Sequence, residues 1–371
     1  MKRTLIVILV VLLAMTSIFA NGAIEEFGFT VPLEPSAQEG TITAFEKYGH
    51  ALLNIRIDDF LAAGYELGDT LDVKFSNGFE FTGIPFFNGY YVAKGEPMVR
   101  AYPGQEFIAV CINYGKVYEV AGLSIGDTVT ISLNEKAAAL DTQVLNSLSY
   151  TNERSDYSSD AVFANYRRVG SSKLYRSCSP VSNEAGRAAY ADALIKQAGV
   201  KAVLNLADSD DEIKGYIAAE GFASPYYKQL FENGKVVALS MSVDYSSSSF
   251  GQTLVDGLKK LETLDGPYLV HCTEGKDRAG FVSALLEALM GYSYDAIVAD
   301  YMESYSNYYG VSKASDSKRY EVIVNNNING MLKVISGEQF ATADLSIGAK
   351  SYLAKYGMTD AQISKLLSVL K

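Results

Sequence analysis

The sequence predicts two domains of different class: a small β-rich, barrel-like domain, followed by an α/β domain with a central, mostly parallel sheet flanked by helices. Between residues 41 and 133, short apolar runs alternate with turn residues, a pattern typical of antiparallel strands. Beyond residue 160, short apolar runs alternate with helical stretches, which favours a layered α/β sheet. A polar segment separates the two patterns. We therefore expect domains at 23–135 and 161–371, joined by a linker at 136–160.

The composition is that of a folded, acidic protein. The chain has 371 residues, of which 48% are hydrophobic and 20% charged, enough to form two cores. It carries 32 Lys and Arg against 43 Asp and Glu, a net charge of −11, whereas a nucleic-acid binder carries a basic surface, so we expect no nucleic-acid partner. Three cysteines do not make a disulfide framework, and two histidines leave little for a zinc site. We expect no metal and no cofactor, and any metal chemistry would need carboxylate ligands.

The first 22 residues are typical of a secretory signal peptide. Two basic residues precede an apolar run at 5–14, and a stretch of small residues at 17–23 offers cleavage after Ala20 or Gly22. A membrane-spanning helix would need about 20 apolar residues, more than this run contains. We therefore expect an exported protein, periplasmic or secreted, with no stable membrane insertion after cleavage.

The β-rich region is expected to form a small barrel. The dipeptide Asn77-Gly78 lies between two alternating runs and predicts a tight hairpin, because both residues tolerate positive φ. Residues 64–71 and 122–129 repeat a Gly-Asp turn followed by a strand, which suggests internal pseudo-symmetry. The region holds no cluster of acids, bases and nucleophiles, so we expect a binding or structural module of unknown partner, in which His50 is structural. The expected strands are 51–57, 71–75, 79–81, 106–112 and 128–133.

The second domain is expected to alternate strands and helices and then to become helical. Its strands are apolar along their whole length, as in sheets covered on both faces. The expected strands are 201–206, 236–241 and 267–271. The expected helices are 183–197, 208–219, 250–264, 279–290, 294–305, 318–335 and a final pair within 344–370.

One segment of this domain, residues 267–280, carries the candidate chemistry. It runs strand, short loop, helix, and in open α/β sheets ligands bind beyond the carboxyl ends of such strands. Consecutive N–H groups of the loop and the helix N-terminus would cradle an anion, with Gly275 allowing the curl and Arg278 gripping two oxygens. The same positive potential would stabilise a thiolate at Cys272. The segment therefore predicts phosphoryl transfer through a covalent phosphocysteine.

This loop resembles the signature of a known family. His271 and Cys272, followed after five residues by Arg278, resemble the protein tyrosine phosphatase superfamily. The form His-Cys-x-x-Gly-Lys-Asp-Arg is similar to its bacterial tyrosine and phosphoinositide phosphatase branch. Upstream, residues 164–170 and 173–177 resemble the opening Asn-aromatic-Arg-Asp-x-Gly-Gly and Leu-Tyr-Arg-Ser elements of that branch. The likeness covers about residues 160–310 and none of the barrel.

The resemblance implies a role for each residue of the loop. Cys272 would be the nucleophile, Arg278 the phosphate clamp and His271 the residue that orients the cysteine. Lys276 would add a second cation, associated in this superfamily with phosphoinositide as well as phosphotyrosine substrates. The implied substrate-binding set is Thr273, Glu274, Gly275, Lys276 and Ala279, with Asp277 closing the backbone cradle.

The leaving oxygen needs a proton, and two aspartates compete to supply it. Asp277 lies in the loop itself, whereas Asp244 lies in a serine-rich segment. We favour Asp277, as the bacterial branch would.

Three positions depart from the family pattern. Ala279 stands where the family usually has Ser or Thr, whose hydroxyl helps to expel the thiolate, so we expect slow turnover. Arg168 stands where the opening motif has Asp, and Ala207 replaces a commoner basic or acidic residue. Glu212 and Asp208 are then the candidates for the carboxylate that supports the loop arginine.

We therefore expect an exported, cysteine-dependent phosphatase acting on phosphomonoesters, on a phosphorylated protein, a phosphoinositide or an inositol phosphate. A first alternative is a weak pseudophosphatase or phosphate-binding protein, in which Ala279 has ended turnover. A second is an arsenate-reductase or rhodanese-like thiol enzyme, with Cys178 as the resolving thiol.

Overall fold

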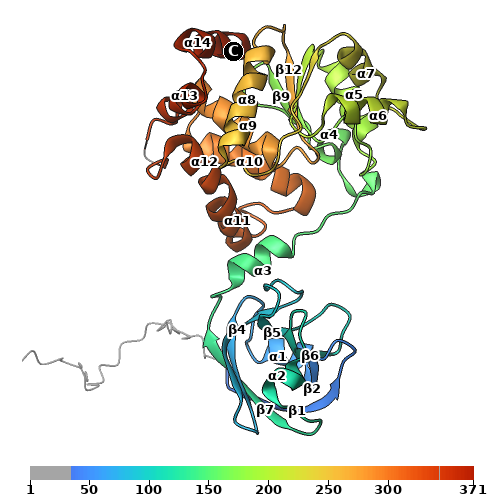
Figure 1. Cartoon of the computed structure of the whole chain (residues 1–371), viewed down its shortest axis with the longest axis vertical. Helices are drawn as coiled ribbons and strands as arrows, with labels where there is room; N and C mark the ends of the chain where they lie inside the picture. Colours follow the sequence, from blue (N-terminus) through green and yellow to red (C-terminus); the bar gives the residue numbers. More distant parts are fainter. Residues whose placement is uncertain (1–34, 342) are drawn as a thin grey trace, which may run out of the picture.

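The computed structural model describes residues 35–341 and 343–371. It contains a closed β-barrel followed by a five-stranded sheet flanked by helices, so a barrel domain precedes an α/β domain as predicted (Figure 1). The predicted signal peptide, residues 1–22, lies outside the described residues. Within the described part of the chain, no helix is long and apolar enough to cross a membrane.

The barrel closes seven strands around one apolar core. Its strand order is β1-β2-β6-β5-β4-β3-β7, and only β4 and β5 pair in parallel. All five predicted strands are present, and the Asn77-Gly78 hairpin joins β3 to β4 with Gly78 at φ 88°. Strands β1 and β5 and two short helices were not predicted from the sequence. The elements are β1 Gln38–Phe45, β2 Ala51–Arg56, α1 Ile57–Ala62, β3 Thr70–Phe75, β4 Glu80–Phe87, β5 Pro97–Arg100, β6 Phe107–Ile112, α2 Val117–Ala121 and β7 Thr128–Glu135.

The sequence repeat forms two equivalent turns. Gly68 and Gly126 adopt φ 96° and 95°, which glycine reaches without steric cost. The aspartate after each glycine, Asp69 or Asp127, accepts a 2.8 Å hydrogen bond from the backbone N–H three residues earlier. The two turns lead into β3 and β7, which are neighbours in the barrel.

The second sheet has the order β11-β10-β12-β9-β8. The four strands from β11 to β9 pair in parallel, and β8 pairs antiparallel to β9, so the sheet is mixed. Strands β10, β11 and β12 were predicted from the sequence, and β8 and β9 were not. The bounds are β8 Arg167–Arg168, β9 Leu174–Ser177, β10 Ala202–Asn205, β11 Val236–Ala238 and β12 Tyr268–His271.

Helices cover both faces of this sheet, which explains its uniformly apolar strands (Figure 1). Val203 and Leu269 pack with α5, α6 and α7, whereas the alternate residues Leu204 and Val270 face the core of the C-terminal helices. The predicted helix 318–335 is interrupted by a π-turn at Val324–Ile328. The helices are α4 Asp160–Phe163, α5 Ala188–Gln197, α6 Asp210–Ala218, α7 Pro225–Glu232, α8 Ser248–Leu261, α9 Arg278–Met290, α10 Tyr294–Tyr309, α11 Ser317–Ile323, α12 Asn329–Ser336, α13 Leu345–Lys355 and α14 Asp360–Leu370.

The segment expected to be a linker contains helix α3, Leu140–Asn146, which contacts both domains (Figure 1). On the barrel side, the Gln143 amide donates a 2.7 Å hydrogen bond to Asn88. On the other side, Val144 is buried in the core of the α/β domain, and Asn326 donates a 3.0 Å hydrogen bond to Asp141. The connection is therefore a packed helix.

Candidate active site

The predicted catalytic loop follows β12, the strand between β10 and β9. Cys272 is the first residue after that strand and is 3% exposed, and α9 begins at Arg278. The loop therefore occupies the carboxyl end of an interior parallel strand, directly before a helix N-terminus. This is the position at which open α/β sheets bind anions.

The carbonyl groups of the loop point outward because neighbouring groups donate hydrogen bonds to them. No described residue accepts a hydrogen bond from the backbone N–H groups of residues 273–277. With their carbonyls held outside, these N–H groups are left to bind an anion beside the cysteine. The bonds are Ser179 N–H to Thr273 O at 2.9 Å, Asn165 Nδ2 and Tyr308 Oη to Glu274 O at 3.1 and 2.7 Å, and Arg176 Nη2 to Gly275 O at 2.8 Å.

Gly275 is required by the close approach of the loop to β9. It has φ 70°, and a Cβ at this position would lie 2.2 Å from the carbonyl oxygen of Ser177. A side chain here would push the loop away from the sheet edge that holds it.

Arg278 is held across the loop by neutral groups. Its Nη1 donates to the Met241 carbonyl at 2.9 Å, and its Nη2 donates to Thr273 Oγ1 at 3.1 Å. No described carboxylate forms an ion pair with Arg278, so its charge remains available to an anion.

Asp208 and Glu212 were the two carboxylates expected to support Arg278. Of the two, only Asp208 has a pKa that the charge of Arg278 affects. Burial raises the pKa of Asp208, and the charge of Arg278 opposes that rise. Glu212 instead accepts 2.7 Å hydrogen bonds from the N–H and hydroxyl of Ser209 and caps α6. Glu212 is therefore a helix cap and the expectation that it supports the arginine is wrong.

A buried chain of hydrogen bonds holds the base of the loop. His271 is fully buried, and burial lowers its pKa to about 3, so the ring is neutral. Because a carbonyl only accepts, the proton is on Nδ1, which donates to Cys272 O at 3.2 Å. Nε2 then accepts from Tyr227 Oη at 3.4 Å, and Tyr227 accepts from Asn205 at 2.9 Å. His271 is therefore a neutral group, and it holds the backbone of Cys272 in place through this hydrogen bond.

Lys276 and Asp277 form a charged cluster at the loop. The ammonium of Lys276 lies 3.2 Å from both carboxylate oxygens of Asp277 and 3.5 Å from Glu274. It also lies 5.3 Å from the ring centroid of Tyr305. Burial lowers the pKa of Lys276, but Asp277 and the neighbouring groups raise it above its usual value, so the cation is retained. The Asp277 side chain is 49% exposed and open to a substrate.

Asp244 lies in a segment that borders the same loop. Its carboxylate accepts a 2.6 Å hydrogen bond from the Ser246 hydroxyl. The next residue, Tyr245, stacks on Phe281 of α9 with centroids 5.4 Å apart. Burial raises the pKa of Tyr245, and the charges of Asp277 and Asp244 raise it further, so both candidate acids lie near the same tyrosine.

Sequence reasoning missed the arginine network behind the loop. Arg176 is fully buried, forms an ion pair with Asp300 and donates to the loop carbonyl of Gly275. Arg167 donates to the other oxygen of Asp300 at 2.8 Å. Burial raises the pKa of Asp300, but the two arginines lower it more, so the carboxylate is charged. Both arginines lie in the upstream elements that resemble the family, whereas Asp300 lies in α10 without any local sequence signal.

Cys178 lies beside the loop but is a poor candidate for a resolving thiol. It lines a cavity of about 220 Å³ together with Thr273 and Glu274. Burial raises its pKa to about 12, so its thiol is protonated at neutral pH.

Ala279 is fully buried at the second position of α9 and brings no hydroxyl to the site.

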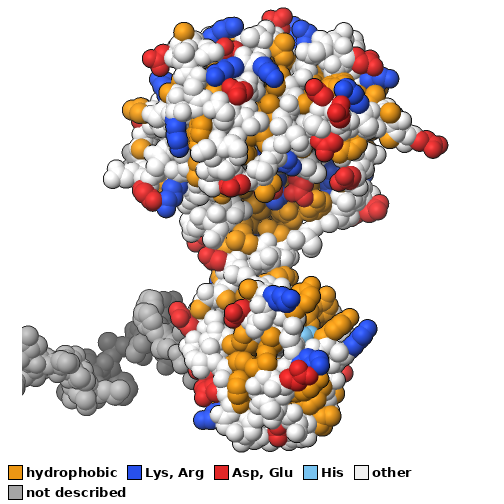
Figure 2. Space-filling model, viewed as in Figure 1, with side chains coloured by type: hydrophobic (Ala, Val, Ile, Leu, Met, Phe, Trp, Pro, Cys, Tyr) orange, Lys and Arg blue, Asp and Glu red, His pale blue; other side chains and the backbone are white. Residues whose placement is uncertain are grey.

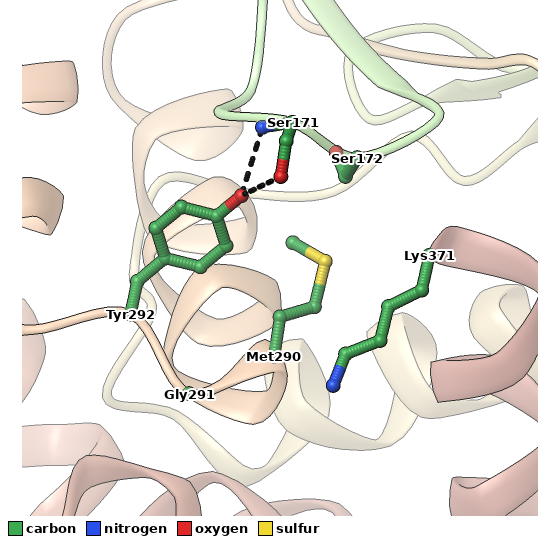
Figure 3. Close-up of a pocket in the computed structure, with 6 residues that line it drawn as sticks. All are labelled: Ser171, Ser172, Met290, Gly291, Tyr292 and Lys371. Carbon is green, nitrogen blue, oxygen red and sulfur yellow. Dashed lines mark hydrogen bonds between the residues drawn. The ribbon is translucent and has the colours of Figure 1, made fainter.

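A larger hollow of about 450 Å³ lies at the other end of this helix, roughly 20 Å away along its axis (Figure 3). There the Ser171 N–H donates to Tyr292 Oη at 2.9 Å, and no cysteine lines the hollow. Among residues 35–341 and 343–371, no group of three or more His, Cys, Asp or Glu side chains is placed to hold a metal ion.

The comparisons with known proteins agree with this geometry. A model of the tyrosine phosphatase family matches residues 160–370, more than half of the chain. The chain belongs to the tyrosine phosphatase family. The matched region includes the loop, the upstream arginines and all C-terminal helices.

Curated relatives match over short stretches. The triple specificity protein phosphatase PtpB of Mycobacterium tuberculosis is 55% identical over 38 residues, 10% of this chain and 14% of the relative. A protein of Cupriavidus necator named as a tyrosine-protein phosphatase is 56% identical over 36 residues, 10% of this chain and 13% of the relative. The core catalytic domain of the PP-IP phosphatase SIW14 of S. cerevisiae is 18% identical with a TM-score of 0.26, covering 45% of this chain and 94% of that domain.

Proposed function

We propose that the protein is an exported, cysteine-dependent phosphatase that hydrolyses phosphomonoesters through a phosphocysteine intermediate. One observation carries the proposal. The carbonyls of the loop are bonded outward by Ser179, Asn165, Tyr308 and Arg176, which leaves the N–H groups of residues 273–277 for a phosphoryl group beside Cys272. Export rests on the signal-like first 22 residues.

The reaction uses the residues of this loop alone. The thiolate of Cys272 attacks phosphorus, the P–S bond forms, and the P–O bond to the leaving group breaks while Asp277 gives that oxygen a proton. Arg278 and the loop N–H groups hold the phosphoryl oxygens through the transition state. Water then attacks phosphorus and returns a proton to Asp277. The P–S bond breaks, which releases phosphate and restores the thiolate.

The substrate class follows from the charges at the entrance. The side chain of Lys276 is 12% exposed and lies beside the half-exposed Asp277, with its ammonium over the rings of Tyr305 and Tyr309. A second cation at the cradle suits a ligand with more than one phosphate, and the aromatic rings suit a flat or cyclic leaving group. We therefore propose phosphotyrosyl proteins and phosphoinositides or inositol phosphates as substrates. PtpB, named as a triple specificity protein phosphatase, is similar to this chain over a short stretch.

The test is hydrolysis of p-nitrophenyl phosphate in EDTA by the full chain and by Cys272→Ser. Cys111→Ser is the matched control, because Cys111 is equally buried but lies in the barrel. We expect turnover that vanadate inhibits, that Cys111→Ser retains and that Cys272→Ser abolishes. Full activity in Cys272→Ser would overturn the proposal.

A second candidate, a phosphate receptor without turnover, is favoured by one observation, the buried Ala279. Its sign would be a single burst of p-nitrophenol, about one per protein, with no steady rate afterwards. Steady turnover would exclude it.

A further inference from the structure

The barrel has a cavity of about 660 Å³ that plays no part in the proposed reaction. Its volume is in the range of small-molecule sites. On the face drawn in Figure 2, the barrel shows a histidine among hydrophobic, Lys or Arg, and Asp or Glu side chains. The lining residues are Lys47, Tyr48, His50, Tyr90, Asn113, Tyr114, Gly115 and Lys116.

Three separate connections build this cavity. Lys47, Tyr48 and His50 come from the turn between β1 and β2, Tyr90 comes from the segment between β4 and β5, and the rest follow β6. Tyr114 has φ 57°, a left-handed conformation that costs free energy for a side-chain-bearing residue, and it is 85% exposed. The chain thus accepts strain at a position that presents an aromatic ring to solvent beside the cavity.

Tyr90 and His50, which line the cavity, belong to a part-buried polar cluster. Arg100 is 6% exposed, is ion-paired with Glu46 at 2.9 Å and donates to Tyr90 Oη, also at 2.9 Å. The proton of Tyr90 finds a partner when it is donated to His50 Nε2, 3.1 Å away, and we assign the bond in this direction. Burial and Arg100 lower the pKa of His50, so the ring is neutral and its proton is on Nδ1.

The N–H at Nδ1 of His50 has no partner among the described residues. His50 is 4% exposed, and this nitrogen is buried and unbonded. Buried polar groups are nearly always hydrogen-bonded, so this unused donor, in a residue that lines the cavity, is an unfilled hydrogen-bonding position in the cavity wall.

The lining also selects the charge and shape of that ligand. Two lysines and no carboxylate line the cavity, in a chain whose net charge is −11. One of the lysines, Lys116, is ion-paired at 2.7 Å with Glu119, which does not line the cavity, and Lys47 has no such pair within the described chain. The three tyrosines offer ring faces for stacking.

We propose that this cavity binds a small ring-bearing organic anion. The ring stacks on Tyr48, Tyr90 or Tyr114, the acidic group faces Lys47 and Lys116, and His50 lies in the wall beside the ligand. Two sources share this chemistry, a nucleotide and an acidic sugar. The inference does not depend on the phosphatase proposal, because no residue of the catalytic loop takes part.

The chain offers a direct readout, because it contains two histidines, one in each site. Nuclear magnetic resonance of the full chain with labelled histidine rings would follow His50 in the barrel and His271 behind the catalytic loop. The Cys272→Ser background prevents hydrolysis of phosphorylated probes. The probes are nucleoside monophosphates, a uronic acid, the matching uncharged nucleoside and sugar, and inorganic phosphate, each at about millimolar concentration.

We expect at least one ring-bearing anion to shift the His50 signal saturably, and the nucleotide and uronic-acid arms identify its source. Inorganic phosphate is expected to move only the His271 signal. Lys47→Ala and Tyr114→Gly should weaken the response at His50 by about tenfold or more. Tyr114→Gly relieves the positive φ, so it keeps the fold, and Lys74→Ala, on strand β3 outside the cavity, is the matched control that leaves binding unchanged.

The proposal is overturned if no ring-bearing anion moves the His50 signal, or if the uncharged nucleoside or sugar moves it as strongly as its acid. A shift that Lys47→Ala and Lys74→Ala reduce equally would also overturn it.

Discussion

The two domains each contain a buried cysteine, an arginine and a histidine that can be compared, and the two sets differ in chemistry. In the barrel, Cys111 lies within strand β6, and burial raises the pKa of its thiol to about 12 even though Arg100 opposes this. Arg100 is already neutralised by Glu46 at 2.9 Å. In the α/β domain, Cys272 lies between a strand and a helix N-terminus.

The difference lies in the backbone and in what surrounds the charge. A residue inside a strand has its neighbouring N–H groups committed to the ladder, as those around Cys111 are. The N–H groups after Cys272 have no acceptor among the described residues, and no described carboxylate neutralises Arg278. The thiol therefore lies inside a strand ladder in one domain and beside an anion cradle in the other.

The largest effect that separates the two sets is expected at the arginines. Arg278→Lys removes the planar fork that holds two phosphoryl oxygens, so kcat/KM should fall by about 10³-fold. Arg100→Lys is the matched change in the barrel and should leave kcat/KM unchanged. Both variants would be assayed with p-nitrophenyl phosphate after their folding has been checked by circular dichroism. An equal loss in both would mean that the barrel takes part in the reaction.

The second comparison is between the two aspartates around Tyr245. Asp277→Asn removes the proton donor and should lower kcat by about 10²-fold for a substrate with a poor leaving group, such as phenyl phosphate. The loss should be smaller for p-nitrophenyl phosphate, whose leaving group needs less protonation. Asp244→Asn should change neither rate, because its carboxylate is bonded to Ser246. The reverse pattern would assign the general acid to Asp244.

Much of the fold follows from local patterns in the sequence. The Asn77-Gly78 hairpin and the Gly-Asp turns need positive φ at their glycines, and glycine at these positions predicts such turns from the sequence. Strands β8 and β9 were missed because they are two and four residues long and carry the charged Arg167, Arg168 and Arg176. Helix α3 was missed because its helical character comes from packing against two domains, which no local window contains.

The candidate site divides in the same way. Cys272 and Arg278 are close in sequence, so their spacing reveals the loop. Its support comes from residues far apart in the chain, and Arg176 meets Asp300 across 124 positions. Asp300 bears no local mark of its role, since one acidic residue in a helix is ordinary. Glu212 was misjudged because a helix cap and an ion-pair partner look alike until the fold is known.

The two histidines provide a comparison in stability. His271 stays neutral in the folded protein down to about pH 3, whereas in the unfolded chain it takes a proton near its ordinary pKa of 6.5. Between about pH 3 and pH 6.5 the unfolded state therefore binds more protons than the folded state. The free energy of unfolding is unaffected by His271 above pH 6.5 and falls as the pH drops below that value. Between about pH 7.5 and pH 5, the loss should be about 2 kcal/mol in the free energy of unfolding.

Urea unfolding followed by the helical circular dichroism signal would measure this loss, because the helices lie mainly in the α/β domain. His271→Asn should remove about 2 kcal/mol of the pH dependence. His50→Asn should leave the pH dependence of this signal unchanged, because His50 lies in the barrel. A pH dependence that is the same in His271→Asn and the parent chain would contradict the buried, neutral ring.

The smallest expected effect is a gain, and it tests the departure from the family pattern at the catalytic loop. Ala279→Ser restores a hydroxyl at the start of α9, where it can donate a hydrogen bond to the departing thiolate as the P–S bond breaks. If that step limits turnover, kcat should rise by up to about tenfold, equal to about 1.4 kcal/mol. The burst of p-nitrophenol should shrink at the same time, because less phosphocysteine accumulates.

Ser283→Ala is the matched control for this gain. Ser283 lies one turn further along α9, is fully buried, and its hydroxyl has no partner among the described residues. If the Ser283 hydroxyl already donated a hydrogen bond to the departing thiolate, Ser283→Ala would slow the breakdown of the phosphocysteine and enlarge the burst. We expect no change in Ser283→Ala, because four residues of helix place its hydroxyl about 6 Å further along the axis, beyond hydrogen-bonding distance of a group at the helix start. A rise in kcat in Ala279→Ser, with no change in Ser283→Ala, would show that the missing hydroxyl at position 279 limits turnover in an otherwise intact loop.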